Sequence, residues 1–269
     1  MTNAAQHQHK HNGEPGRVIY EVRDLVAQYG NTRVLEGVSC QIYAGEVFVI
    51  IGASGSGKTT LLKHMCGLLK PVSGEVLYIG VNIAQMDEEQ LARMLRKMGI
   101  AFQSSGLINS MTVGENVALP LREYGGVDEI LIEAIVRMKL SLVGLAAAEN
   151  LMPEELSGGM RKRAGLARAI ALEPPVVFFD EPSAGLDPIT AAGVDELVLD
   201  LRKLLGITFI IVTHELDSIR LVADRILMLD RGKVIFTGTV EEAEKNQNER
   251  VRQFFERRPD EYITQRNIV

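Results

Sequence analysis

The sequence predicts an α/β fold in which a helical segment interrupts a series of strands. Three observations lead to this prediction. Short apolar runs rich in β-branched residues recur along the chain, which is typical of strands. The run at residues 47–51 is apolar throughout, as expected of a strand buried on both faces. Between about residues 105 and 172 the apolar residues instead follow helical spacing.

The expected elements alternate in a regular order. The first part of the chain predicts strands at residues 18–22, 34–42, 47–51 and 99–102, and helices at 59–69 and 87–98. The middle segment predicts helices at residues 128–143 and from 157 to about 172. Strands then resume at residues 176–179, 208–213, 226–229 and 234–236. An α/β core with an inserted helical subdomain accounts for this order.

The two ends of the chain differ from this pattern. Residues 1–16 are polar and lack apolar periodicity, which predicts a disordered tail. Residues 17–240 are expected to form the folded domain, with the helical subdomain at about 105–172. Residues 241–269 are charged and are expected to form a helical C-terminal tail. Its apolar residues Val251, Phe254 and Phe255 are expected to pack on the domain or on a partner.

Composition narrows the classes of function. The net charge of −6 provides no concentrated basic face, so no nucleic-acid partner is expected. The short basic run Arg161-Lys162-Arg163 is interpreted as a solvated helix face. The apolar runs are far shorter than the ~20 residues that span a bilayer, and the N-terminus lacks the apolar core of a secretory signal. Any link to a membrane is therefore expected to run through a partner protein.

Residues 52–59, Gly-Ala-Ser-Gly-Ser-Gly-Lys-Thr, fit the phosphate-binding pattern G-x-x-x-x-G-K-[ST]. The pattern lies between a predicted strand and a predicted helix, which is the context it requires. Its glycines let backbone N–H groups surround an anion at a helix N-terminus. Lys58 is expected to hold the outer phosphates, and the Thr59 hydroxyl to bind Mg²⁺. The predicted ATP-binding residues here are Gly52, Ala53, Ser54, Gly55, Ser56, Gly57, Lys58, Thr59 and Thr60.

A second group of candidate residues follows the apolar run at 176–179. Asp180 comes at the tip of this predicted buried strand, where its carboxylate is expected to bind Mg²⁺ directly or through water. Glu181 follows at once and is expected to act as general base toward the attacking water. A strand ending in Asp-Glu is a weak signal alone, but together with the phosphate loop it indicates nucleotide hydrolysis.

Between these two motifs lies Leu156-Ser157-Gly158-Gly159-Met160, which resembles the L-S-G-G-Q signature of ABC ATPases. The resemblance covers about residues 18–238. It implies a P-loop NTPase fold with a RecA-like core, an antiparallel β subdomain and an inserted helical subdomain. It also implies four roles for residues matching the family pattern. These are adenine stacking for Tyr29, Mg²⁺ contact for Gln103, coupling of two facing sites for residues 183–187, and contact with the γ-phosphate for the catalytic His214.

The resemblance also implies a homodimer of ATPase subunits. In the family, the signature binds the γ-phosphate of the ATP held by the opposite subunit, a role that here falls to Ser157, Gly158 and Gly159. A helix starting at Ser157 would offer a hydroxyl and free N–H groups to that phosphate. Met160 stands where the family usually has glutamine, so any hydrogen bond made by that glutamine is lost.

The Gly-Gly-Met form of the signature, followed by Arg-Lys-Arg, resembles one branch of the family, the ATPases of Mla- and Mce-type lipid transporters. Residues 102–107, 111–123 and 178–189 resemble the same branch. This implies an integral-membrane permease, an MCE-domain lipid-binding protein and a small regulatory subunit as partners. It further implies phospholipid movement between inner and outer membranes, with the ATPase peripheral on the cytoplasmic face of the inner membrane.

Three other functions compete with lipid transport. A soluble ABC ATPase acting on DNA or ribosomes is disfavoured, because the sequence has one phosphate loop and no long coiled-coil insertion. The ATPase of an importer for amino acids or another small solute would carry the same ATP chemistry, so only cargo or permease separates it. A non-catalytic ATP-gated subunit is disfavoured by the intact Lys58, Asp180, Glu181 and His214.

Overall fold

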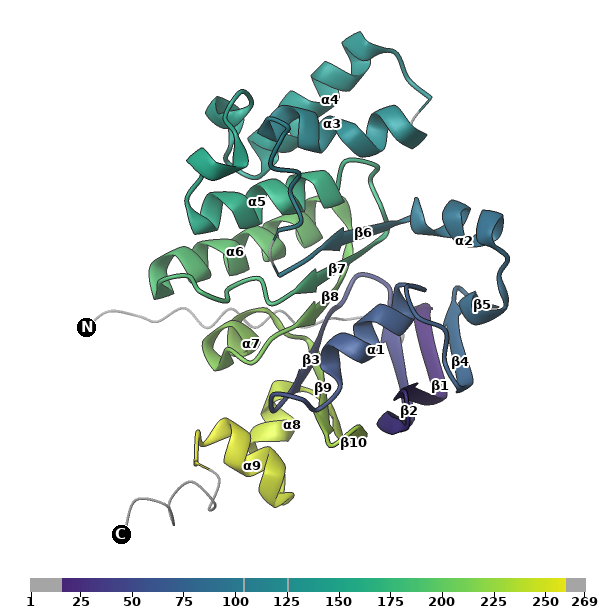
Figure 1. The fold of residues 1–269 in the computed structure, drawn as a ribbon. Coiled ribbons are helices and arrows are strands. Elements are labelled where there is room, and N and C mark those ends of the chain that lie inside the picture. The colour runs from purple at the N-terminus through teal and green to yellow at the C-terminus, as the bar shows by residue number, and fades with distance from the viewer. Residues whose placement is uncertain (1–15, 104, 125, 260–269) are drawn as a thin grey trace, which may run out of the picture.

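The computed structural model describes residues 16–103, 105–124 and 126–259, so the tail expected at residues 1–16 lies outside them except for Gly16. Two sheets and a group of helices make up the described fold (Figure 1). The strands are β1 (Val18–Tyr29), β2 (Thr32–Tyr43), β3 (Val47–Gly52), β4 (Ser73–Tyr78), β5 (Val81–Asn82), β6 (Met98–Ala101), β7 (Val176–Asp180), β8 (Thr208–Val212), β9 (Arg225–Asp230) and β10 (Lys233–Gly238). The α-helices are α1 (Lys58–Met65), α2 (Glu88–Leu95), α3 (Val113–Tyr124), α4 (Glu129–Leu142), α5 (Gly158–Ala169), α6 (Pro188–Leu205), α7 (Leu216–Val222), α8 (Val240–Glu244) and α9 (Glu249–Phe255).

The larger sheet has the strand order β10-β9-β3-β8-β7-β6. Its strands are parallel except for β10, which pairs antiparallel with β9. Along β3, Phe48 and Ile50 face one core cluster, whereas Val49 and Ile51 face another. A parallel sheet needs crossover helices that cover both its faces. The uninterrupted apolar run of β3 is the consequence of this double burial.

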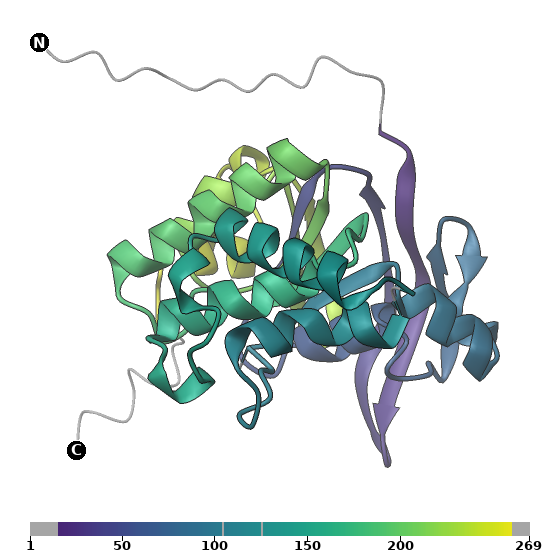
Figure 2. The ribbon, with the colours of Figure 1, turned by 90° about the horizontal axis from the view of Figure 1, so that it is seen from above.

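The smaller sheet is antiparallel, with the order β2-β1-β4-β5. Figure 2 shows its long strands β1 and β2 standing beside the α/β core. Its inner face shares one core cluster with α1 and with one face of the larger sheet. Leu25 and Leu35, one from each long strand, are fully buried there. The β1–β2 hairpin is thereby fixed against the segment that follows β3.

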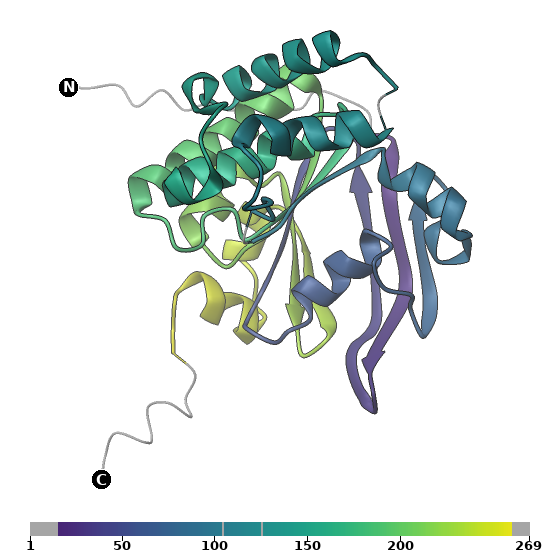
Figure 3. The same ribbon diagram turned by 45° about the horizontal axis from the view of Figure 1, so that its top comes forward.

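Helices α3, α4 and α5 share a third core cluster of their own. In Figures 1 and 3, α3 and α4 lie on the outer side of α5. Apolar residues at helical spacing, such as Val117 on α3 and Val136 and Leu140 on α4, are buried in this cluster. Helix α3 is not among the predicted helices. Pro120 lies inside it, and an interior proline removes one backbone donor and normally indicates a helix end.

Two predicted helices are shorter than expected. The helix expected to reach residue 69 ends at Met65, because Gly67 takes a left-handed conformation with φ +68° and the chain reverses. The helix expected at 87–98 is α2, which begins after the N-cap Asp87 and ends at Leu95. Met98 instead begins β6 and pairs with Val176. An apolar residue at that position fits either the helix face or the strand, so spacing alone does not decide.

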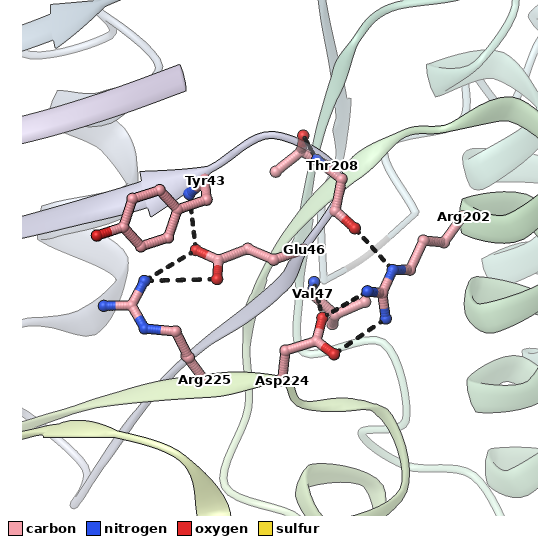
Figure 4. A network of polar contacts seen from close by, with 8 residues as sticks. Tyr43, Glu46, Val47, Arg202, Thr208, Asp224 and Arg225 are labelled. Carbon is pink, nitrogen blue, oxygen red and sulfur yellow. Dashed lines mark hydrogen bonds and ion pairs between the residues drawn. The ribbon is translucent and has the colours of Figure 1, made fainter. Parts of the chain in front are cut away.

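A buried polar network fixes the start of β3 (Figure 4). Glu46 accepts hydrogen bonds from the Tyr43 backbone N–H at 2.8 Å and from Arg225 Nη1 at 3.2 Å. Asp224 accepts from the Val47 N–H at 2.8 Å, and its carboxylate also pairs with Arg202 at 2.9 Å. Burial raises the pKa of Glu46, while the Tyr43 N–H and Arg225 lower it. These contacts tie β3 to β9 and α6, at the end of the strand opposite the phosphate loop.

Candidate active site

The phosphate-binding pattern forms a loop between β3 and α1. The Lys58 ammonium donates hydrogen bonds to the carbonyl oxygens of Gly52 at 2.8 Å and Ala53 at 3.0 Å. Burial lowers the pKa of Lys58, and the nearby Glu181 and Asp180 carboxylates act in the opposite direction. Helix α1 has no side-chain cap at its N-terminus. The N–H groups of its first turn are therefore available to an anion.

Two glycines of the loop are required by close approach of the backbone. A Cβ at Gly52, where φ is +145°, would lie 2.2 Å from the Leu229 carbonyl oxygen. A Cβ at Gly57, where φ is +105°, would lie 2.6 Å from Leu35 Cδ2. Neither contact is possible for a real side chain without movement of the loop, so β9 and the β1–β2 hairpin shape the phosphate loop from both sides.

The first prediction concerns this close approach. Replacing Gly52 by alanine should push the loop away from β9 and weaken ATP binding, because the backbone N–H groups lose their arrangement. Gly55→Ala is the matched control: Gly55 also has a positive φ, +77°, but no atom lies within 4 Å of its Cβ position. Equilibrium binding of a fluorescent ATP analogue measures both. Equal loss of affinity in the two variants would show that positive φ, and not the contact with Leu229, governs the loop.

The two predicted acidic residues lie at the end of β7. Asp180 is buried, with 8% of its surface exposed, and its Oδ1 has no hydrogen-bond partner among the described residues. Burial and the neighbouring Glu181 raise the pKa of Asp180, while Lys162 and Lys58 lower it. Glu181 has a φ of +49°, which is uncommon for a residue with a long side chain. Strain of this kind is found preferentially at functional sites.

His214 follows β8 and approaches Glu181 from the next strand. Its Nδ1 lies 2.9 Å from Glu181 Oε1. The other oxygen, Glu181 Oε2, is buried and has no partner among the described residues. Glu181 thus has one oxygen oriented by His214 and one free to accept a proton from a bound molecule.

Six of the predicted site residues line one cleft of about 700 Å³. They are Gly52, Ala53, Ser54, Lys58, Glu181 and His214. The remaining wall comes from residues that sequence reasoning did not assign to the site, namely Leu216, Met228, Asp230, Arg250, Gln253, Phe254, Arg257 and Arg258. The last five belong to α9 and the residues just after it. Val251 and Phe255 are buried against the domain, so α9 packs on its own chain.

The residues present fit a Mg²⁺–nucleotide complex. Among the described residues no group of three or more His, Cys, Asp or Glu side chains is arranged to hold a metal alone. Asp180 Oδ1 and Ser56 Oγ are both buried and unpartnered, and Thr59 lies in the first turn of α1. Magnesium commonly takes one or two protein ligands and completes its shell with phosphates and water. This set matches that demand.

Tyr29 and Gln103 do not line the cleft. Tyr29 is the last residue of β1, and its ring is 49% exposed. It pairs with Thr32 across the hairpin that contacts the phosphate loop through Leu35, so its ring remains accessible near that loop. Gln103 follows β6 and is exposed.

The signature residues also lie outside the cleft of their own chain. Ser157 is exposed and caps α5, its hydroxyl accepting a hydrogen bond from the Met160 N–H at 3.2 Å. A Cβ at Gly159 would lie 2.4 Å from Thr190 Cγ2, so α5 and α6 pack closely there. Met160 packs against the third core cluster. The side chain at this position therefore serves the helical core in this chain.

One sequence interpretation is wrong. The basic run 161–163 is not a uniformly solvated face, because Lys162 is buried with 7% of its surface exposed. Its ammonium contacts the backbone at Gln103 and Glu181. Consecutive residues on a helix point about 100° apart, and the middle residue of the run faces inward. Sequence spacing to Ala164 and Leu166 could have placed Lys162 near the buried side.

A parallel sheet with a phosphate loop after β3, carboxylates after β7 and a histidine after β8 defines a nucleotide-hydrolysing protein of the P-loop class. A family model for the ABC transporter matches residues 35–184. The chain is 40% identical over 238 residues to the intermembrane phospholipid transport system ATP-binding protein MlaF of Escherichia coli K12, and the match covers 88% of each protein. It is 41% identical over 240 residues to the probable ribonucleotide transport ATP-binding protein mkl of Mycobacterium leprae, covering 89% of this chain and 69% of that protein.

Solved structures agree with these matches. The cbiO1 protein of Clostridium perfringens, part of the ABC transporter complex cbiONQ, superposes with a TM-score of 0.79 at 31% identity, covering 86% of this chain and 92% of that chain. The ATP-binding cassette MJ0796, a dimer in a post-hydrolysis state with ADP and Pi, gives a TM-score of 0.76 at 31% identity, covering 82% and 98%. The chain belongs to the ABC transporter family and is an ATPase of that family.

Proposed function

We propose that this ATPase drives phospholipid transport between inner and outer membranes, through a separate permease and an MCE-domain protein. The observation that carries the proposal is the 40% identity to MlaF, which extends over 88% of both proteins. The similar identity to mkl, named for probable ribonucleotide transport, makes a small-solute transporter the alternative. Among the described residues no helix is long and apolar enough to cross a membrane. We therefore assign the chain to the cytoplasmic face of the inner membrane, held there by the permease.

The proposed chemistry assigns a role to each residue around the cleft. The phosphate loop with Lys58 holds the β- and γ-phosphates of ATP, and Tyr29 stacks on adenine. Thr59, Asp180 and Gln103 would hold Mg²⁺, which neutralises phosphate charge when bound. Glu181 Oε2 takes a proton from the attacking water, while the contact with His214 orients the carboxylate.

Two copies of the chain complete two sites in this proposal. Ser157, Gly158 and Gly159 of one subunit bind the γ-phosphate of the ATP on the other. Support comes from the exposed Ser157 at the start of α5 and from its position outside the cleft of its own chain. ATP then joins the subunits, and hydrolysis lets them separate, which converts chemistry into movement. We further propose that residues 105–172 act as the helical subdomain and 241–269 as a separate tail.

The second prediction tests the dimer. Ser157→Arg should leave ATP binding to the single chain intact but prevent ATP-driven dimerisation, because a bulky cation would occupy the place of the γ-phosphate contact. Ser141→Arg, near the end of α4, is the matched control for the added side chain and charge. Light scattering after size exclusion, with ATP and Mg²⁺, measures the mass. Normal dimerisation of Ser157→Arg would remove the proposed role of the signature.

The permease is proposed to dock beside the loop that contains Gln103. Exposed apolar side chains support this placement, since Phe102 and Ile108 flank the loop and each exposes 36% of its surface. Purification of the tagged chain from detergent-solubilised membranes, with mass spectrometry of proteins and lipids, tests the whole proposal. A permease together with an MCE-domain protein and bound phospholipid is the expected result. A solute permease without an MCE partner would contradict the cargo, and ribosomes or DNA would contradict transport itself.

A further inference from the structure

Helix α5 carries a buried cation whose role the proposed chemistry does not include. Lys162 Nζ donates a hydrogen bond to the Gln103 carbonyl oxygen at 2.5 Å and another to the Glu181 carbonyl oxygen at 2.7 Å. A buried ammonium costs free energy unless it is hydrogen-bonded or paired. Lys162 meets this demand by joining two backbone segments that are far apart in sequence and that belong to different parts of the site.

The first of these segments is strapped to α5 over its whole length. Two turns beyond Lys162, Arg168 donates to the Gly106 carbonyl oxygen at 2.7 Å and to that of Ser105 at 3.3 Å. Between the two cations, a Cβ at Gly165 would lie 2.9 Å from the Ser105 carbonyl oxygen. The loop after β6 therefore packs directly on α5. Helix α5 and the Gln103 loop are expected to move as one unit.

The second segment is the peptide of the proposed general base. Glu181 has the positive φ of +49°, and its carbonyl oxygen accepts from Lys162 and, at 3.3 Å, from the Ala184 N–H. Its own N–H donates to the Val212 carbonyl oxygen at 2.8 Å. A strained backbone persists only where its surroundings hold it. Lys162 is the side chain among these contacts, and it reaches Glu181 from outside the sheet.

We propose that Lys162 is a positioning residue for hydrolysis, which couples the placement of Glu181 to the position of α5 and the Gln103 loop. The carboxylate would then reach the attacking water only when the signature helix and this loop occupy the arrangement that Lys162 bridges. Contacts of α5 with the second subunit and of the loop with the permease would thereby act on the base. Burial lowers the pKa of Lys162, and Asp180 and Glu181 raise it, so these carboxylates also favour the cationic form.

The inference rests on the proposed role of Glu181, and three variants of the full-length chain test it. Lys162→Met keeps the side-chain length but donates no hydrogen bond, and it should lower kcat for ATP hydrolysis by about 100-fold while KM changes little. Lys162→Arg, which can still donate to both carbonyls, should recover most of the turnover. Lys139→Met is the structural control, since Lys139 is an equally buried lysine (1% exposed) that pairs with Glu173 in the helical part. Thermal unfolding is measured for all three, and kcat is expressed per folded protein.

A double variant separates positioning from general damage. If Lys162 acts through Glu181, adding Lys162→Met to Glu181→Gln should slow the residual hydrolysis no further, because residues that act as a unit are not additive. Unchanged kcat in Lys162→Met, an equal loss in Lys139→Met, or a full additional loss in the double variant would overturn the inference. Wild-type turnover in Glu181→Gln alone would instead refute the proposed base, so the two failures are distinguishable.

Discussion

Replacing Glu181 by glutamine is expected to slow ATP hydrolysis by about 100- to 10,000-fold, the usual contribution of a general base. Glutamine keeps the shape of the side chain but cannot take a proton from water. Oε2 of Glu181 is buried, unpartnered and on the wall of the cleft, so no other group in the described part of the chain replaces it at that point. Steady-state release of phosphate measures the change.

The same variant should still bind ATP and should accumulate as a dimer, because the step that separates the subunits is slowed. Light scattering with ATP and Mg²⁺ detects the dimer, and exchange of ATP for ADP should abolish it. Glu196→Gln removes an exposed carboxylate from α6 and serves as the charge-matched control. Rapid turnover by Glu181→Gln would show that another group is the base.

Replacing Lys58 by alanine is expected to weaken ATP binding by about 10- to 100-fold, which corresponds to the ~1.5–3 kcal/mol of a hydrogen bond to a charged group. The ammonium already lies in the loop, where it donates to the Gly52 and Ala53 carbonyl oxygens. Phosphate oxygens are stronger acceptors than these carbonyls, so bound ATP is expected to draw the ammonium away from them.

Isothermal titration calorimetry on the full-length chain measures this affinity directly. Lys70→Ala, which removes an exposed lysine beyond the end of α1, controls for the change in net charge. Unchanged ATP affinity in Lys58→Ala would contradict the assigned phosphate contact.

The fold could be predicted where local pattern and global environment agree. The run of β3 is apolar on both faces because helices and the second sheet cover both sides of the sheet, and the loop after it is fixed by motif and context. Helix α3 could not be predicted in the same way. Pro120 contradicts the local rule for helices, and burial of Val117 and Leu121 in the third cluster overrides it.

The candidate site could be predicted only as far as its residues belong to a motif. Lys58, Glu181 and His214 line the same cleft, although they are far apart in sequence, because parallel strands present their carboxyl ends at one edge of the sheet. The wall formed by α9 has no such pattern. Phe254 on that helix is apolar and lines the cleft, while the neighbouring Phe255 is buried in the core. Only tertiary packing distinguishes the two.

Lys162 shows a related limit. A lysine between two arginines is most often solvated, and nothing in the run of three indicates which member turns inward. Its partners are backbone carbonyls of Gln103 and Glu181, and every residue has a carbonyl. No side-chain pattern could therefore have identified the contact.

The central claim is that ATP hydrolysis by this chain drives phospholipid movement, and reconstitution tests it most directly. The complex that co-purifies with the chain is placed in liposomes, and transfer of labelled phospholipid to or from the complex is followed with and without ATP. The account predicts ATP-dependent transfer with the wild-type chain and loss of transfer with Glu181→Gln. Transfer at the wild-type rate with Glu181→Gln, or no transfer by a wild-type complex whose ATPase activity responds to a small solute instead, would contradict it.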